Sequence, residues 1–186
     1  MLTWQFLFIS IITLLRQIPQ IPLWAMERKK KNRVLSEGKG LTALIYVLYS
    51  GIWILTIYKT YDNPPAFGWG MALSVALLVY GTGLRFVSLT TLGRSFNSNI
   101  VIEKDHKLIT TGVYSSVRHP IWLGLIIETL GMIVFSTSFY LIPVWVGTIL
   151  TVVTQIGAED RALYEKLGKE AGRYQEGVPR MIPGIW

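Results

Sequence analysis

Long apolar stretches alternate with short polar ones along the 186-residue chain. Leu41–Tyr58 and Ala66–Leu84 contain no charged residue. Each approaches the ~20 residues that a helix needs to cross the hydrocarbon core of a bilayer. The pattern therefore predicts a membrane-spanning helix in each stretch.

A further span is predicted over Leu2–Trp24, although Arg16, Pro19 and Pro22 interrupt its second half. The segment lacks the basic start and the small-residue cleavage site of a secretory signal peptide. We therefore interpret it as a retained helix.

The stretch Ile121–Ala158 is 38 residues long, and Glu128 is its only charge. A single helix of this length would measure about 57 Å, far more than a bilayer is thick. Two helices joined by a turn near Ser136–Ser138, with Pro143 early in the second, fit better. The sequence thus predicts an all-α integral membrane protein with five transmembrane helices.

The composition agrees with a membrane protein: 51% of the residues are hydrophobic and 16% are charged, against about 25% charged in a soluble domain. The chain has no cysteine. This excludes disulfides, thiolate catalysis and cysteine-metal sites, and we expect no metal site.

The formal net charge is +7, and its basic residues lie in short loops beside apolar spans. That distribution favours cytoplasmic loops and anionic lipid headgroups over nucleic acid, which we do not expect as a partner. Glu27–Lys39 holds six basic residues and should be cytoplasmic, so the N-terminus lies outside. Thr90–Arg118 and Glu159–Trp186 then meet on the cytoplasmic side, as a loop and a C-terminal helical tail.

Candidate chemistry begins with Arg118-His119-Pro120, at the start of the fourth predicted helix. Proline suits the first turn of a helix, whose free N–H groups and positive dipole end can hold a carboxylate. Arg118 alone is also typical of a snorkelling membrane anchor. The run as a whole favours a binding site.

Glu159 and Asp160 follow the fifth predicted helix, and the tail after them should begin as a helix that ends near Gly168. The acidic pair either lies on a solvated turn or receives a cationic partner, and the basic character of this face favours the partner. Gly81-Thr82-Gly83 fits close helix packing at least as well as ligand contact.

Several of these motifs, in this order, resemble the isoprenylcysteine carboxyl methyltransferase family, within the wider group that includes phospholipid N-methyltransferases. The resemblance runs from about Gly93 to Pro183, whereas the first three helices match only in hydropathy. It rests on His106–Ile109, Thr111–Tyr114, Arg118–Pro120, Glu159–Asp160, Leu167–Gly168, Tyr174 and Val178–Arg180.

The resemblance implies an S-adenosylmethionine-dependent methyltransferase. Its cofactor contacts would come from the polar loop, the start of the fourth helix and the acid after the fifth. Arg118 and His119 suit the cofactor's carboxylate, and Glu159 can offset its ammonium and sulfonium. No strand-turn-helix glycine motif of a soluble Rossmann enzyme is present. The implied cofactor residues are His106, Lys107, Leu108, Ile109, Tyr114, Arg118, His119, Pro120, Ile121, Trp122 and Glu159.

On this interpretation residues 1–90 form a three-helix membrane region. Residues 91–186 form the cofactor-binding core, including the last two spans and the tail. The acceptor should be a lipophilic or prenylcysteine-like molecule delivered from membrane lipid. The oligomeric state stays open.

Three positions depart from the family pattern. Gln155 stands where prenylcysteine enzymes place an arginine for the substrate carboxylate, Trp122 replaces a tyrosine, and Ala171 replaces the first tyrosine of the tail. Glu128 should be buried, either as a protonated acid bonded to a neighbouring helix or as a lining of the lipid cavity.

We take Glu159, Gln155 and Glu128 as the catalytic candidates. Because Gln155 and Glu128 make the site less positive, the sequence favours an amine or another lipid-borne nucleophile as acceptor. A phospholipid or amine N-methyltransferase and an inactive lipid-binding relative are the alternatives.

Overall fold

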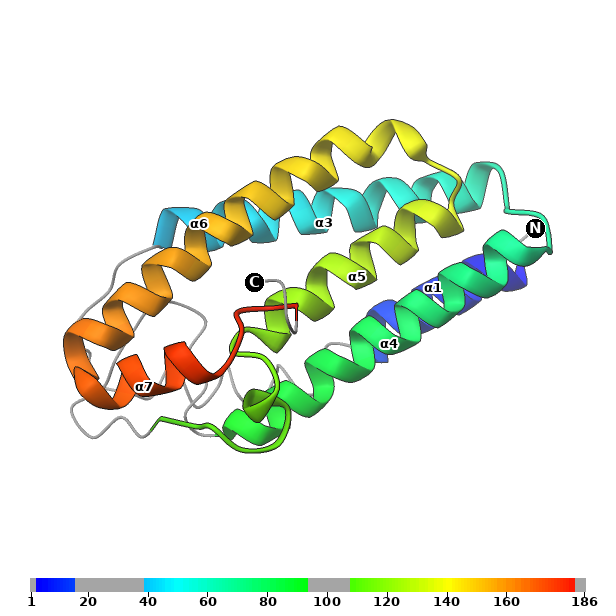
Figure 1. Ribbon diagram of the computed structural model, residues 1–186. Helices are drawn as coiled ribbons and strands as arrows, with labels where there is room; N and C mark the ends of the chain where they lie inside the picture. The colour runs from blue at the N-terminus through cyan, green and yellow to red at the C-terminus, as the bar shows by residue number, and fades with distance from the viewer. Residues whose placement is uncertain (1–2, 16–38, 94–107, 183–186) are drawn as a thin grey trace.

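The computed structural model describes residues 3–15, 39–93 and 108–182, and within these ranges the chain is helical, with no strand (Figure 1). The all-α expectation is confirmed for this part of the chain. The helices are α1 Trp4–Leu15, α3 Lys39–Asp62, α4 Trp69–Leu92, α5 Pro120–Phe135, α6 Ile142–Leu167 and α7 Lys169–Gly177, with short 3₁₀ turns η2 Gly112–Ser115 and η3 Phe139–Leu141.

Three segments are long and apolar enough to cross a bilayer: Gly40–Asp62, Trp69–Leu92 and Phe139–Leu167. The chain is therefore a multi-pass membrane protein. The helices α1 and α5 are also apolar but have only 12 and 16 residues, about 18 and 24 Å of helix. The total of five spans and the side on which each end lies stay predictions.

The predicted start of the fourth span and the predicted end of the tail's first helix are confirmed, whereas α4 continues to Leu92, beyond the predicted end at Leu84. The part of the first predicted span after Leu15 lies outside the described residues. Pro120 occupies the first turn of α5, and the turn after α5 includes Thr137 with a positive φ of 53°. Gly168 ends α6 with a φ of 55°, a conformation that glycine adopts without strain. The fifth span and the start of the tail, however, form one continuous helix, because residues 159–167 contain no glycine or proline.

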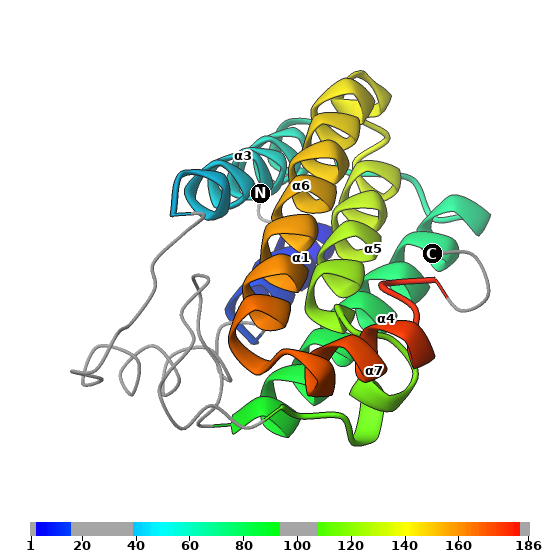
Figure 2. The ribbon, with the colours of Figure 1, turned by 60° about the vertical axis from the view of Figure 1, so that its left-hand side comes forward.

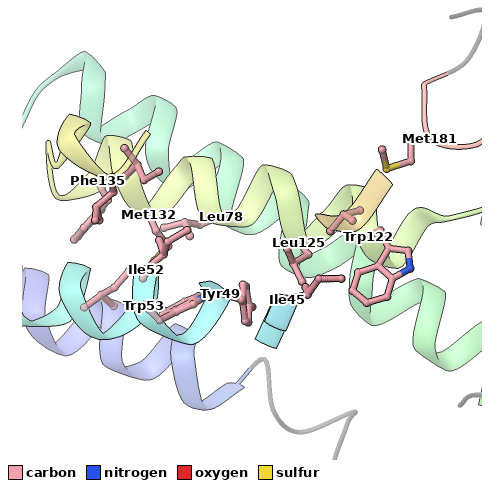
Figure 3. Close-up of a cluster of buried hydrophobic side chains, with 14 of the residues drawn as sticks. Ile45, Tyr49, Ile52, Trp53, Leu78, Trp122, Leu125, Met132, Phe135 and Met181 are labelled. Carbon is pink, nitrogen blue, oxygen red and sulfur yellow. The ribbon is translucent and has the colours of Figure 1, made fainter. Parts of the chain in front are cut away.

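The helices α3, α4, α5 and α6 run side by side, with α1 against α3 (Figures 1 and 2). The core between them includes Ile45 and Tyr49 of α3, Leu78 of α4 and Leu125 and Met132 of α5 (Figure 3). The core extends to Trp122, at the first turn of α5, and to Met181, which follows α7. This apolar contact fixes the tail against the bundle.

Large apolar side chains also cover the outside of the bundle. Val47, Val79 and Leu150 are each at least 60% exposed, whereas Thr56 and Ser74 are completely buried. This distribution is the reverse of that in a water-soluble protein, in which an extended apolar surface is rare. It agrees with a surface that faces lipid.

The α3–α4 and α5–α6 turns lie at the end of the bundle away from α7 (Figure 1). Exposed aromatic side chains occur at both turns. Trp69 is 93% exposed, Phe67 87%, and Tyr140 64%. Tryptophan and tyrosine are typical of the boundary between a membrane and water. This end of the bundle is thus chemically suited to one face of the bilayer.

Glycines bring α4 and α5 into very close contact. A Cβ at Gly81 would lie 2.8 Å from backbone atoms of Gly124 and Glu128, whereas a Cβ at Gly83 would meet nothing within 4 Å. Helices in membranes commonly associate through such small residues. Close helix packing therefore explains Gly81, and Gly83 faces open space.

The carboxylate of Glu128 lies between three helices and is completely buried. Arg85 of α4 donates to it at 2.7 Å, Tyr49 of α3 at 2.7 Å and Thr82 at 2.9 Å. Glu128 is thus bonded to neighbouring helices, as one interpretation predicted. It also forms an ion pair with Arg85, which that interpretation did not include. The interpretation of Glu128 as a lining of the lipid cavity and its assignment to catalysis stay predictions, and its carboxylate is enclosed and ion-paired with Arg85.

Replacement of Gly81 by alanine should destabilise the protein by about 1–3 kcal/mol, because the added methyl group collides with the backbone of α5. Gly83→Ala is the matched control and should be neutral or stabilising, since alanine is the better helix former. Thermal unfolding in detergent measures both variants. Equal unfolding temperatures would show that the close contact does not limit stability.

Replacement of Glu128 by alanine should cost about 3–5 kcal/mol, because it leaves the buried guanidinium of Arg85 without a counter-charge. The double variant Arg85→Met/Glu128→Met removes both charges and should recover most of the loss. Chemical unfolding of the single and double variants measures this difference. A double variant no more stable than Glu128→Ala would contradict the ion-pair explanation.

Candidate functional site

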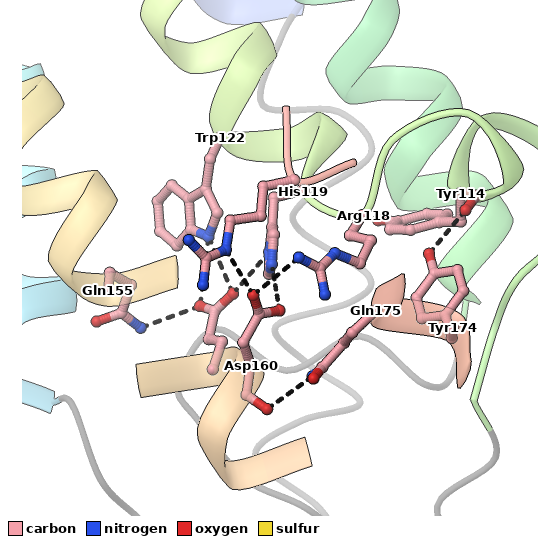
Figure 4. Close-up of polar contacts among 10 residues, drawn as sticks. Tyr114, Arg118, His119, Trp122, Gln155, Asp160, Tyr174 and Gln175 are labelled. Atoms are coloured by element: carbon pink, nitrogen blue, oxygen red, sulfur yellow. Dashed lines mark hydrogen bonds and ion pairs between the residues drawn. The ribbon is translucent and has the colours of Figure 1, made fainter. Parts of the chain in front are cut away.

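A cluster of charged side chains lies where the N-terminus of α5, the C-terminal part of α6 and the segment after α7 meet (Figure 4). We call it the carboxylate cluster. It consists of Arg118, His119, Glu159, Asp160 and Arg180. The two polar segments that the sequence predicts to converge are therefore in contact.

The imidazole of His119 lies between two carboxylates. Its Nδ1 is 3.2 Å from Oε2 of Glu159, and its Nε2 is 2.9 Å from Oδ1 of Asp160. A carboxylate can only accept, so both ring nitrogens must carry a proton to satisfy this geometry. Burial lowers the pKa of His119, but the hydrogen bonds to Asp160 and Glu159 outweigh it and raise this pKa above its usual value.

Asp160 connects three parts of the chain. Besides His119, its carboxylate accepts from Nε of Arg180 at 2.9 Å and lies 3.2 Å from a guanidinium nitrogen of Arg118. Its backbone oxygen accepts from the amide of Gln175 in α7 at 2.8 Å. Both carboxylate oxygens are thus engaged by cations of the protein itself.

Glu159 has a different environment from its neighbour. Gln155 donates to Oε1 at 3.0 Å and Trp122 donates to Oε2 at 3.1 Å. Its side chain is 23% exposed, against 9% for that of Asp160. Glu159 is therefore the acid of the cluster that is more accessible to a ligand.

The segment after α7 is bound to the start of α5 through its backbone. The amides of Arg118 and His119 donate to the carbonyl oxygens of Pro179 and Arg180, both at 2.9 Å. Tyr174 of α7 donates to the carbonyl oxygen of Tyr114 at 2.7 Å. The tail thus covers one side of the carboxylate cluster and binds the two backbone amides that precede α5.

Burial affects the other ionisable groups here. It raises the pKa of Tyr174 to about 12, although Arg118 opposes this, and it raises the pKa of Tyr114 further. Burial also lowers the pKa of Arg118, while the charge of Asp160 opposes that shift. Both phenols are therefore neutral at physiological pH, and that of Tyr174 donates a hydrogen bond.

Three buried polar atoms at this end have no hydrogen-bond partner among the described residues: Oη of Tyr114, Nε of Arg118 and Oε1 of Gln155. The Gln155 side chain is completely buried, with its nitrogen on Glu159 (Figure 4). An unsatisfied buried polar atom is costly. A bound molecule could satisfy them, by accepting from Nε of Arg118 and by donating to Oε1 of Gln155.

The structure brings together most, but not all, of the residues predicted for the site. Tyr114, Arg118, His119, Trp122, Gln155 and Glu159 lie in or beside the carboxylate cluster (Figure 4). Pro120 begins α5 immediately after His119. Leu108 and Ile109 are half-buried before η2.

Other predicted residues fall elsewhere. Ile121 packs against Leu89 of α4 in a separate apolar cluster. Glu128 belongs to the ion pair with Arg85. His106 and Lys107 lie outside the described residues.

The sequence analysis did not single out Asp160, Arg180, Tyr174 or Gln175 as site residues. Each belongs to the tail or adjoins Glu159, and three of them fall in motifs that carried the family resemblance. Helical spacing alone does not distinguish Asp160 from Glu159, because only the folded tail shows which acid receives the arginines.

Comparison with known proteins identifies similar chains. Residues 74–165 match the model of the isoprenylcysteine carboxyl methyltransferase (ICMT) family. Protein-S-isoprenylcysteine O-methyltransferase B of Arabidopsis thaliana is 30% identical over 124 residues, which cover 63% of this chain and 61% of the relative. Protein-S-isoprenylcysteine O-methyltransferase of Schizosaccharomyces pombe is 29% identical over 161 residues, covering 82% and 62%. The chain thus spans less than two thirds of the length of these relatives.

The fold is also similar to a solved structure. The eukaryotic intramembrane Ras methyltransferase ICMT matches with a TM-score of 0.71 and 22% identity, over 95% of this chain and 64% of that one. At this identity the likeness shows the fold. The resemblance that the sequence motifs indicated is confirmed.

Replacement of Tyr174 by phenylalanine should weaken the attachment of the tail by about 1 kcal/mol, the value of one hydrogen bond. The exposed Tyr164 provides a matched control, Tyr164→Phe. Hydrogen exchange at the amides of Arg118 and His119 should become about fivefold faster in the first variant only. Unchanged exchange would mean that the phenol does not hold the tail.

Proposed function

We propose that this chain, whose residues 74–165 match the model of the isoprenylcysteine carboxyl methyltransferase family, is an integral membrane methyltransferase. It uses S-adenosylmethionine to methylate a lipid-borne acceptor of the prenylcysteine class. The observation that carries the proposal is the carboxylate cluster, in which His119 lies between Glu159 and Asp160 at the ends of membrane helices.

The residues of the site fit the chemical groups of this cofactor. Oε1 of Gln155 and the carboxylate of Glu159 present acceptors on α6, and the Arg118 Nε–H is a donor without a partner among the described residues. S-adenosylmethionine carries an ammonium and a carboxylate, which need an acceptor and a donor. The unpaired atoms therefore match a zwitterion in both charge and hydrogen-bonding role.

We assign the cofactor contacts to residues from the polar loop and both helix ends. Glu159 and Gln155 would hold the ammonium side, and Arg118 would hold the carboxylate side. The adenine would lie among apolar and aromatic side chains. The remaining contacts we propose are His106 and Lys107, which lie outside the described residues, together with Leu108, Ile109, Tyr114, His119, Pro120, Ile121 and Trp122.

When bound, this cofactor supplies a methyl group made electrophilic by a sulfonium. A carboxylate acceptor is ionised at neutral pH and needs no general base, so the protein contributes alignment and exclusion of water. The tail, attached through Pro179, Arg180 and Tyr174, is placed to exclude water from the cluster. Glu159 would offset the positive charge of the bound cofactor.

The proposed function also predicts how the protein is oriented in the membrane. The basic loop and the carboxylate cluster face the cytoplasm, the N-terminus lies outside, and α1 and α5 complete five spans. Residues 1–90 form the membrane region and residues 91–186 the cofactor-binding core. The acceptor enters sideways from the bilayer between helices.

Gln155 supports a second candidate acceptor, an amine lipid. Its Nε2 donates one N–H to Glu159, and Oε1 is the atom without a hydrogen-bond partner among the described residues. In this alternative Oε1 faces the acceptor amine and not the ammonium of the cofactor. Such an oxygen favours an N–H group over a carboxylate. Glu128 does not make the site less positive, because Arg85 offsets its charge.

Purified protein should bind S-adenosylhomocysteine and methylate a prenylcysteine in detergent or vesicles. Glu159→Gln should weaken binding by about tenfold or more, the loss of about 1.4 kcal/mol. Glu165→Gln, at an exposed position on the same helix, should bind like the parent. Calorimetry measures binding, and transfer of a labelled methyl group measures turnover.

The results separate the alternatives. Turnover of an amine lipid but not of prenylcysteine would favour the second candidate. Cofactor binding without turnover of either acceptor would favour an inactive lipid-binding relative. The absence of S-adenosylhomocysteine binding in the parent protein would overturn the proposed function.

A further inference from the structure

We propose that Asp160 is a positioning residue, which holds His119 as an imidazolium with both N–H groups donating and so keeps the Nδ1–H on Glu159. Its role in catalysis rests on the proposed function. Its control of the histidine ring does not.

Glu159 and Asp160 are neighbours in sequence, yet their side chains make different contacts. Oδ1 of Asp160 contacts His119, and Oδ2 contacts Arg118 and Arg180. Both oxygens are therefore already engaged within the protein. Glu159 binds neutral donors of Gln155 and Trp122 in addition to His119, and it is the more exposed side chain. The geometry therefore separates an internal acid from an acid that can meet the cofactor.

The charges around His119 make its protonation depend on Asp160. Arg118 precedes it in the chain, Arg180 approaches from the tail, and both acids come from α6. The phenols Tyr114 and Tyr174 nearby are neutral. With Asp160 uncharged, an imidazolium would share this site with two arginines and a single carboxylate. Repulsion would then favour loss of its proton.

The loss of that proton would change the contact with Glu159. A neutral imidazole has one N–H, which can satisfy only one of the two acceptors. The ring would then present a lone pair to one of its two present partners. A lone pair opposite Glu159 would push this carboxylate away from its present position beside Trp122 and Gln155.

The chain has two histidines, His106 and His119. In a His106→Gln protein, the NMR signal of the remaining imidazole reports the titration of His119 directly. We expect its midpoint to lie above the ordinary value for histidine, and Asp160→Asn should lower it by about one pH unit or more. Glu165→Gln, on the exposed face of the same helix, should leave it unchanged.

Thermal unfolding gives a second measurement. A group whose pKa is higher in the folded state stabilises the protein at low pH, and this stability is lost as the pH rises through the folded value. The unfolding temperature of the parent should fall over that range, and the fall should move to lower pH in Asp160→Asn. The paired variant Asp160→Asn/Arg180→Gln keeps the net charge of the cluster and serves if the single variant does not fold.

Binding of S-adenosylhomocysteine is measured with His106 in place. In Asp160→Asn, the pH above which binding weakens should move down together with the titration of His119. A midpoint of His119 that Asp160→Asn leaves unchanged would overturn the proposal. If the midpoint moves but the parent binds no S-adenosylhomocysteine, the assignment of Asp160 stands and the proposed function fails.

Discussion

Pairing of charges away from water holds this protein together at two places. Within the bundle, Arg85 of α4 pairs with Glu128 of α5, and Tyr49 of α3 bonds to both. At the helix ends, Asp160 pairs with cations from the loop before α5 and from the tail. A buried charge without a partner is strongly unfavourable. Each pair therefore selects the one arrangement of helices that brings its members together.

The two places support each other through α5. The close contact of Gly81 with Gly124 sets the distance between α4 and α5, and the ion pair with Arg85 fixes their register. The start of α5 then presents His119 to α6, where Glu159 and Asp160 receive it. The buried network contains no residue of the proposed reaction, but it determines where the reacting end of α5 lies.

Hydropathy was sufficient to predict the helices, because the apolar runs are long and their interruptions are chemically distinct. The distribution of basic residues also predicted that the loop ending at Arg118 and the segment after the last span would meet on one side of the membrane. Hydropathy was insufficient to predict the two buried ion pairs, Arg85–Glu128 and Arg118–Asp160. Arg85 lies one residue beyond an uncharged run, so hydropathy does not place it inside a helix. The contacts of Asp160 depend on the tail, which brings Arg180 to it. Such contacts are set by three-dimensional packing, which a pattern along one chain does not contain.

The continuity of α6 has a consequence for the depth of the acids in the bilayer. A single helix joins the exposed aromatic residues near Tyr140 to Glu159 without a break, and this part of it is about 28 Å long. That length is close to the thickness of the hydrocarbon layer, about 30 Å. Because the helix is rigid, a thicker bilayer cannot be matched by stretching. In a thicker bilayer, either Glu159 and Asp160 would lie below the headgroups, or the bilayer around the protein would have to become thinner.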